Sequence, residues 1–549
     1  MMTNQTQEYV NKVIQQLNKI QDLEITDIRK GKEDFGRYLF GTYKQDPCMI
    51  KIISIQDDQQ VSQQKNLQIL TEKVNRLKMC SHKNIVKYYD SFQIEDNFYI
   101  VMEKVECSLK QWIDDNRKNQ IEKVQFLRFA LQMVEVADYL HQKKHILSNI
   151  SLKNIFLDKD LNIKFSTFTV KQEVSVYKLL NKQIYALENN ELIYFPLCLI
   201  DEGGNENLII QSSKQDMYAI GLCLYCLTGV SYMDVLNYIQ GGKFQANMNL
   251  GVDINLLLQL MLFRNCYSFV PSPCYFIESF QKIISSLNKQ YKENENECQM
   301  KFQMEKDEEV KYLQKFQRIV KQIDYIKEEE QSSSDDEKSE ESESKDSDDV
   351  DRLIDEITKL IQVYKNCDIL YLFLGHCYDK NDDFQQSLNS YQKAFQLNQY
   401  NDIAVYGMGL AWTELENNEE SLICYDKYVN LNPFDDEVYN NIGEIYLKLE
   451  DFQKSKIYFE KSLEINSRQY IAFYNLSQHY FSQKMFQKGS YFLKKAKKIQ
   501  SDDDTFQLLG YFYEQKQEYE KSLKYYSKLN TQDNDVNYVH LSNHIKSLV

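Results

Sequence analysis

A lysine and two glycines near the N-terminus are the residues whose types and spacing could bind a phosphate. Gly31 and Gly36 are separated by four residues, and Lys51 follows fifteen residues after Gly36, at the end of the apolar run 48–50. Glycine serves any tight turn, so the glycine pair alone is a weak signal. The lysine strengthens it, because an amine on an apolar strand can pair with phosphate oxygens.

Further segments follow Lys51 in a fixed order. They are the run 82–89, the apolar run 98–103 that ends in Met102 and Glu103, the triplet 139–141 at the end of an expected helix, and the helix that begins near Asp216. Together with the glycine pair and Lys51, these segments resemble the eukaryotic protein kinase family over about residues 23–285. The resemblance implies a bilobal α+β domain.

The same resemblance implies a nucleotide site in which Lys51 pairs with phosphates and a hinge follows the run 98–103. The candidate nucleotide-binding residues are Gly31, Gly36, Lys51, Met102, Glu103 and Asn154. The acidic partner of Lys51 is in doubt, because the matching position is Lys73 and Glu72 lies on a different helical face.

Three positions that carry catalysis in the family hold unsuitable residues. In register from His141, the catalytic Asp falls on Asn149, the catalytic-loop Lys on Ser151 and the magnesium-binding Asp on Thr167. A neutral amide cannot act as a base, and magnesium prefers anionic oxygens. We therefore expect no catalytic residue and no metal site, with ATP, bound without magnesium, as the candidate cofactor.

The second half of the chain repeats about every 34 residues. Gly375, Gly409 and Gly443 are each 34 residues apart, Ser477 takes the next step and Gly510 follows after 33. This period indicates tetratricopeptide repeats, in which small residues let paired helices approach each other. We predict an all-α superhelical solenoid over 350–549, with five repeats at about 368–536 and a capping helix at each end.

The inner face of such a solenoid, which is formed by the first helix of each repeat, binds an extended peptide or a helix. Asn441 and Asn475 hold the same position on successive first helices and are candidates to bind a peptide backbone. Local packing of these two amides is the alternative. No basic clamp for an acidic chaperone tail is predicted, because the matching positions are His376, Gly407, Asn440 and Glu444.

An acidic serine-rich segment, 328–349, separates the two halves. It holds twelve acidic residues and two lysines, a net charge of −10 out of −16 for the chain. With almost no apolar side chains it is predicted to be a disordered linker, and its serines are candidates for phosphorylation. Residues 1–22 are predicted to form an amphipathic helix, and 286–327 a helical linker with apolar residues such as Val310 and Leu313 on one face.

Composition and local sequence predict where the protein is located and which classes of partner it does not bind. The 549 residues include 16 Gly and 5 Pro, which suits a helix-rich chain. The N-terminus lacks the apolar core of a signal peptide, and the longest apolar run, 217–230, is too short to span a bilayer. We therefore expect a soluble cytoplasmic protein that binds neither membrane nor nucleic acid, since no basic stripe stands out in this acidic chain.

Three functions are open at this point. The favoured one is a pseudokinase joined to a peptide-binding repeat array, which acts as a signalling scaffold with weak, metal-independent ATP binding. The second is an active, divergent protein Ser/Thr kinase whose substrates are recruited by the repeats. The third is a plain adaptor whose kinase-like half binds no nucleotide.

Overall fold

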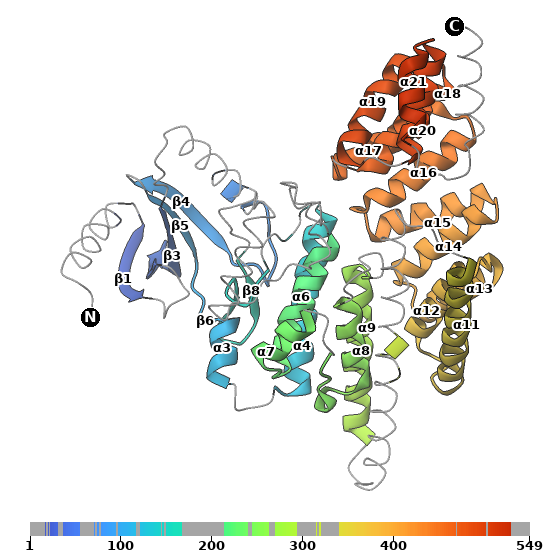
Figure 1. Ribbon diagram of the computed structural model, residues 1–549. Coiled ribbons are helices and arrows are strands. Elements are labelled where there is room, and N and C mark those ends of the chain that lie inside the picture. The colour runs from blue at the N-terminus through green and yellow to red at the C-terminus, as the bar shows by residue number, and fades with distance from the viewer. Residues whose placement is uncertain are drawn as a thin grey trace. The chain divides into compact units, whose positions relative to one another are not determined.

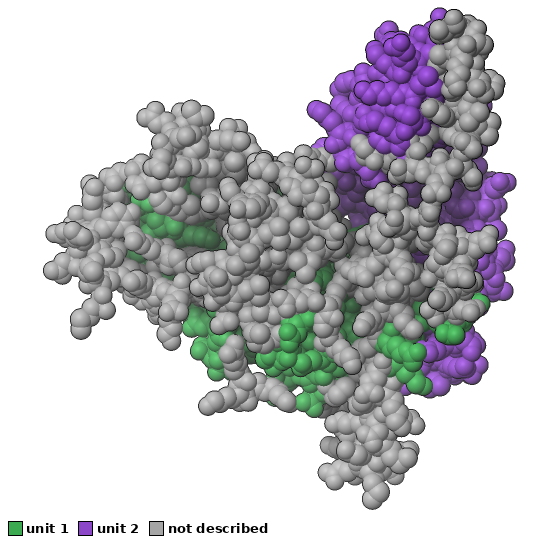
Figure 2. Space-filling model, in the orientation of Figure 1, with its two compact units in different colours: residues 1–353 green, residues 354–549 purple. Residues whose placement is uncertain are grey.

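A computed structural model of the chain forms two compact units, residues 1–353 and 354–549 (Figures 1 and 2). The structure describes residues 17, 20, 22–30, 37–54, 71, 74–75, 78–94, 97–116, 121–143, 145, 147, 150–166, 213–239, 244–262, 270–293, 315, 318–319, 340–467, 469–500 and 503–528. Each unit is described by itself.

The first unit begins with a five-stranded antiparallel sheet in the order β1-β2-β3-β5-β4. Its strands are β1 (Leu23–Lys30), β2 (Arg37–Tyr43), β3 (Asp46–Ser54), β4 (Tyr88–Ile94) and β5 (Asn97–Glu103). Side chains alternate between the two faces of a strand. On β3, Cys48 and Ile50 accordingly join one buried cluster, and Met49 joins the other.

One face of this sheet packs against the segment before β1. Leu17 is fully buried there and Ile20 is partly buried, in a cluster with Leu23, Leu39 and Tyr99. Of the predicted helix 1–22, only these two positions and Asp22 lie within the described residues. Leu17 and Ile20 therefore cover the sheet, as an apolar stripe with helical spacing would.

A small second sheet and a set of helices complete the first unit (Figure 1). The sheet contains β6 (Cys107–Ser108), β7 (Ile155–Leu157) and β8 (Ile163–Phe165). The helices are α3 (Leu109–Asn116), α4 (Lys123–Gln142), α6 (Ser213–Leu227), α7 (Tyr232–Ile239), α8 (Val252–Met261) and α9 (Pro273–Glu293), with a 3₁₀ turn η2 at Met248–Leu250. The predicted bilobal α+β architecture is confirmed.

The described part of the second unit contains the end of helix α11 and five helix pairs with the spacing predicted from the glycines (Figure 1). The pairs are α12 (Asp368–Lys380) with α13 (Phe384–Leu397), α14 (Asp402–Glu414) with α15 (Asn418–Leu431), α16 (Asp436–Lys448) with α17 (Phe452–Ile465), α18 (Tyr470–Ser482) with α19 (Phe486–Ile499), and α20 (Asp503–Gln515) with α21 (Tyr519–Tyr526). The solenoid prediction is confirmed.

Close packing explains why the first helix of a pair needs a small residue. A Cβ placed on Gly443 would lie 2.6 Å from the Phe459 ring, and one on Gly409 would lie 2.5 Å from the Tyr425 ring. Atoms cannot approach this closely without moving the ring or the helix. The 34-residue glycine period is therefore a packing requirement of each helix pair.

Helix α11 corrects the predicted linker. It spans Glu340–Val363 and so includes the last ten residues of 328–349, together with the predicted capping helix at 350–364. In the segment 286–327, residues 286–293 continue helix α9, while Val310 and Leu313 lie outside the described residues. Apolar side chains that follow Val350 stabilise α11 by packing, since Leu353 and Ile357 are almost fully buried.

Candidate functional site

Lys51 lies in the middle of the five-stranded sheet. Strand β3 pairs it with Tyr38 on β2 and with Ile100 on β5. The side chain is partly buried, and burial lowers the pKa of its amine. Among the residues that the structure describes, no carboxylate is bonded to this amine. Glu72 and Lys73, the sequence candidates for its partner position, lie outside those residues.

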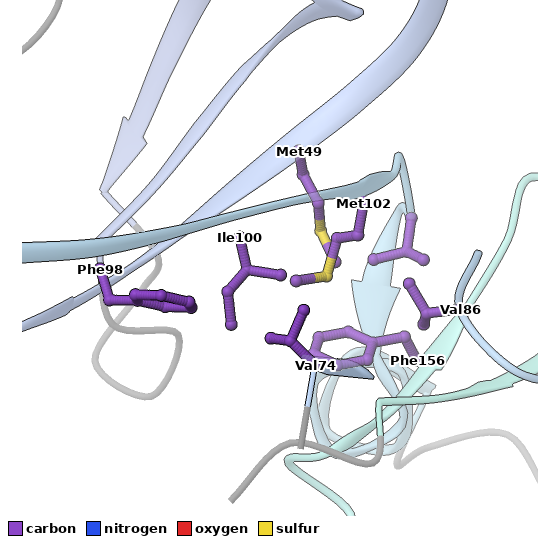
Figure 3. Packing of buried hydrophobic residues seen from close by; sticks show 8 residues of the cluster. Met49, Val74, Val86, Phe98, Ile100, Met102 and Phe156 are labelled. Atoms are coloured by element: carbon purple, nitrogen blue, oxygen red, sulfur yellow. The ribbon is translucent and has the colours of Figure 1, made fainter. Parts of the chain in front are cut away.

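Apolar side chains fill the region between the sheet and β7, beside Met102. Met49, Met102, Val105 and Phe156 belong to one cluster and are between 1% and 4% exposed. Figure 3 shows Met49 and Met102 converging with Phe156 from opposite walls of this cluster. Because Met49 and Lys51 are two residues apart on β3, they lie on the same face of the sheet. The cluster therefore occupies the space next to Lys51 on the hinge side.

The backbone that follows β5 is mostly satisfied by internal hydrogen bonds. The N–H of Glu103 donates to Lys87 O at 2.8 Å, that of Lys104 donates to Pro47 O at 3.3 Å, and that of Glu106 donates to Leu157 O at 2.9 Å. Among the described residues, the N–H of Val105 has no such acceptor. Within the described part of the chain, one backbone donor at the hinge is thus left without a protein acceptor.

The Glu103 side chain is engaged within the protein. Its Oε1 lies 2.8 Å from Nζ of Lys164 on β8, and both side chains are mostly buried. The same oxygen accepts a hydrogen bond from the backbone N–H of Lys87 at 3.1 Å. Glu103 therefore ties the end of β5 to β8, and its carboxylate is not free to bind a ligand.

A buried carboxylate fixes the start of the loop that corresponds to the catalytic loop. Asp216 Oδ2 lies 2.9 Å from His141 Nε2 and accepts a 2.7 Å hydrogen bond from the backbone N–H of Leu147. Burial raises the pKa of Asp216 to about 6, and the hydrogen bond with His141 opposes that increase. Helix α6 therefore holds Leu147 in place through Asp216.

The structure brings several predicted site residues together and leaves others outside the described set. The N–H of Asn154 donates to Ser151 O at 3.0 Å, and the N–H of Ser166 donates to Asn154 O at 3.2 Å. Asn154 therefore lies beside the residue that precedes Thr167. Gly31, Gly36, Asn149 and Thr167 themselves lie outside the described residues.

The inner helices of the repeats use the two predicted asparagines for internal bonds. Asn475 is 5% exposed, and its amide donates to Asn440 Oδ1 at 3.0 Å and to Glu444. The amide of Asn441 donates to Tyr406 OH at 3.0 Å. The structure thus favours the packing alternative, because both amide groups join one repeat to the next. Sequence reasoning did not identify Glu444 as the acceptor of this network.

No metal centre or membrane span is found in the described part of the chain. No three His, Cys, Asp or Glu side chains gather there in a way that could hold a metal ion. None of the helices described has the length and apolar character needed to cross a bilayer.

Comparisons with known proteins agree with this geometry. Residues 17–243 match the family described as protein tyrosine and serine/threonine kinase, and residues 369–401, 436–469 and 504–535 match the tetratricopeptide repeat. The chain is 27% identical over 179 residues to the probable serine/threonine-protein kinase nek2 of Dictyostelium discoideum, covering 31% of this chain and 40% of that protein.

Another similar protein is the serine/threonine-protein kinase TIO of Arabidopsis thaliana, which is 23% identical over 206 residues, covering 38% of this chain and 14% of that protein. The chain thus spans less than half the length of these two relatives. The described strands and the loop held by Asp216 belong to the matched kinase segment. Three of the helix pairs, α12–α13, α16–α17 and α20–α21, belong to the matched repeat segments, and the pairs α14–α15 and α18–α19 lie between them. The chain therefore combines a protein kinase-like domain with an array of tetratricopeptide repeats.

Proposed function

We propose that the kinase-like domain does not transfer phosphate and that the protein is a scaffold whose repeats bind a protein or peptide partner. The observation that carries this proposal is the pair of substitutions at Asn149 and Thr167. Without a carboxylate at the first position the substrate hydroxyl has no base, and without one at the second the magnesium ion loses an anionic ligand. Each loss affects a different step, so compensating one does not restore turnover.

The surroundings of Lys51 support the proposal. In an active kinase the equivalent amine is held by a glutamate as it engages phosphate. Here burial lowers the pKa of the Lys51 amine, and no described carboxylate is bonded to it. The charged form of such an amine is less stable than that of an amine in an ion pair with a carboxylate.

The same surroundings bear on ATP, for which we propose weak binding without magnesium. The Val105 N–H can donate a hydrogen bond to a purine nitrogen, and the Lys51 amine can pair with a phosphate. The base itself needs room between the sheet and β7, where Met49 and Phe156 are packed. Displacing packed side chains costs free energy, and this cost lowers the affinity.

Phosphate transfer from radiolabelled ATP, measured with the full chain on generic protein substrates, tests the central proposal. We expect no incorporation above that of a Lys51→Ala variant, with or without magnesium. Incorporation that depends on Lys51 would establish the second candidate, a divergent protein Ser/Thr kinase. The names of the relatives, which are serine/threonine-protein kinases, and the retention of Lys51 favour that candidate. An Asn149→Ala variant would then show whether the Asn149 side chain contributes to transfer or whether another residue supplies the base.

The repeats supply the binding role in this proposal. The inner helices α12, α14, α16, α18 and α20 form the surface on which tetratricopeptide arrays take a peptide or helix. Because the amides of Asn441 and Asn475 are bonded internally, we assign them to positioning this surface. We also propose a cytoplasmic location and phosphorylation of the acidic serine-rich segment. The mass of the protein isolated from cells tests the phosphorylation.

A further inference from the structure

One helix pair is basic in a chain that is otherwise acidic. Residues 469–500, which form α18 and α19, contain six lysines and neither Asp nor Glu. By contrast, residues 402–435 contain seven acidic residues and one lysine. The expectation that the chain has no basic stripe was therefore wrong for this segment, because the net charge of −16 conceals it.

The lysines gather on one side of α19, which we define as the α19 lysine surface: Lys488, Tyr491, Lys494, Lys495 and Lys498. Positions three and four apart lie on one face of a helix, and Lys488, Lys494 and Lys498 are exposed. The opposite side of α19 packs inside the solenoid through Leu493 and Ala496, which are fully buried.

Aromatic rings accompany these lysines. Lys495 Nζ lies 4.8 Å from the Tyr491 ring centre and 5.2 Å from that of Phe473, and Lys488 Nζ lies 5.6 Å from that of Tyr480. Among the described residues, none of the four lysines of the surface forms an ion pair with a carboxylate. Aromatic contacts hold part of the positive charge in place without neutralising it.

The ordinary explanation of basic residues here accounts for only part of the surface. A cation in the last turn of a helix is stabilised by the helix dipole, and this applies to Lys498. It does not apply to Lys488 in the first turns of α19, where a positive charge is unfavourable. Tyr491 is 56% exposed in the middle of the surface, so its ring is accessible to an apolar group of a ligand that lies along the lysines.

We propose that the α19 lysine surface binds an acidic, extended segment of a partner protein, a run of Asp and Glu side chains with an apolar contact on Tyr491. From Lys488 to Lys498 the helix rises about 15 Å, which matches four or five residues of extended chain. All the cations are lysines, which bind anions as point charges and do not impose the two-pronged geometry that arginine gives to carboxylates and phosphates. The surface therefore suits a run of carboxylates whose orientations vary along an extended chain.

Charge outside the surface argues against larger polyanions. A long nucleic acid or a flat anionic membrane extends beyond one helix, and it would approach a chain of net charge −16 whose segment 402–435 alone carries seven acidic residues. A short acidic segment can stay within one helix length. This site lies on the second helix of its repeat and is separate from the inner-face site proposed above, so either one can fail without the other.

Fluorescence anisotropy of a labelled peptide of alternating Asp and Glu, titrated with the full chain, tests the proposal. We expect saturable binding that a Lys494→Glu/Lys498→Glu variant weakens about tenfold or more, as expected when two attractive contacts become repulsive. A matched control, Lys393→Glu/Lys448→Glu, makes the same change in net charge at exposed lysines of other repeats and should bind as the wild type does. Affinity should also fall as salt rises, because salt screens exposed charges.

Three results would overturn the proposal. Equal loss in both double variants would mean nonspecific attraction, and absence of binding by the wild type would mean that the surface takes no acidic segment. Tighter binding to oligothymidine or to phosphatidylserine vesicles than to the peptide would assign the surface to nucleic acid or membrane. Circular dichroism confirms folding of each variant, and Lys494→Gln/Lys498→Gln replaces the glutamate pair if that pair unfolds.

Discussion

The apolar cluster beside the hinge can be opened by a single substitution, Met49→Ala. Met49 is 2% exposed and packs with Met102 and Phe156. Truncation removes three heavy atoms from this cluster and costs about 2–5 kcal/mol of stability, because the neighbours collapse only partly into the cavity. For a domain of this size each kcal/mol corresponds to about 2–4 °C in melting temperature. We therefore expect a fall of roughly 5–15 °C for the first unit.

The same change should create a binding site for a purine base. The cavity would lie on the side of the sheet where the Val105 N–H is available as a donor. A ligand present at about one hundred times its dissociation constant returns about 2.7 kcal/mol of stability. Adenosine should thus restore roughly half or more of the lost melting temperature of Met49→Ala, and it should shift the wild type little.

The assay is thermal unfolding of the full chain, followed by calorimetry with and without adenosine. Ile50→Ala is the matched control, since Ile50 is equally buried on the same strand but packs in the cluster on the opposite face of the sheet. It should lose stability and gain no response to adenosine. An adenosine shift in the wild type as large as that in Met49→Ala would refute the idea that Met49 closes the site.

Three further substitutions test single contacts by urea unfolding. Lys51→Met should stabilise the protein at neutral pH by about 1 kcal/mol, because it removes an amine whose charged form is disfavoured by burial. Since a lowered pKa means that the folded state binds fewer protons than the unfolded state, the wild type should gain stability as pH rises toward the ordinary lysine pKa, and the variant should not. Loss of stability instead would reveal an acidic partner. Asn475→Ala should cost about 1–3 kcal/mol, because it leaves the buried Asn440 Oδ1 without this donor and reduces Glu444 to its bond from the Asn440 amide. An unchanged midpoint would show that the Asn475 amide faces a ligand instead. Glu450→Gly should stabilise the repeats by up to about 1 kcal/mol, because Glu450 has φ of 59°, a conformation that glycine adopts without strain. Destabilisation would show that the left-handed backbone at Glu450 is not strained.

The repeat half of the fold follows closely from the sequence. The period of small residues predicted both the number of helix pairs and their register, because each glycine of the period faces an aromatic ring of its partner helix, as Gly443 faces Phe459. The kinase-like half was predicted from the order of its segments around Lys51 and Asp216. Local sequence patterns are sufficient to predict a fold where the residues in contact are separated by a constant number of residues.

Contacts between distant segments were not predictable in the same way. Met49 and Phe156 meet only because β3 and β7 lie on two sides of one cluster. The roles of Asn441 and Asn475 depend on neighbours one repeat away, Tyr406 and Asn440, which sequence position alone does not place. The basic character of 469–500 was readable from the sequence but was hidden by the average charge.

The central claim, that this kinase-like domain lacks metal-dependent nucleotide chemistry, is tested most directly by a thermal-shift titration of the full chain with ATP, with and without magnesium. A Lys51→Ala variant serves as the control for binding at the nucleotide site. The substitutions at Asn149 and Thr167 predict at most a small shift that magnesium does not enlarge. A shift that requires magnesium and disappears in Lys51→Ala would contradict the claim, because it would place a metal-nucleotide complex where the family's active members hold it.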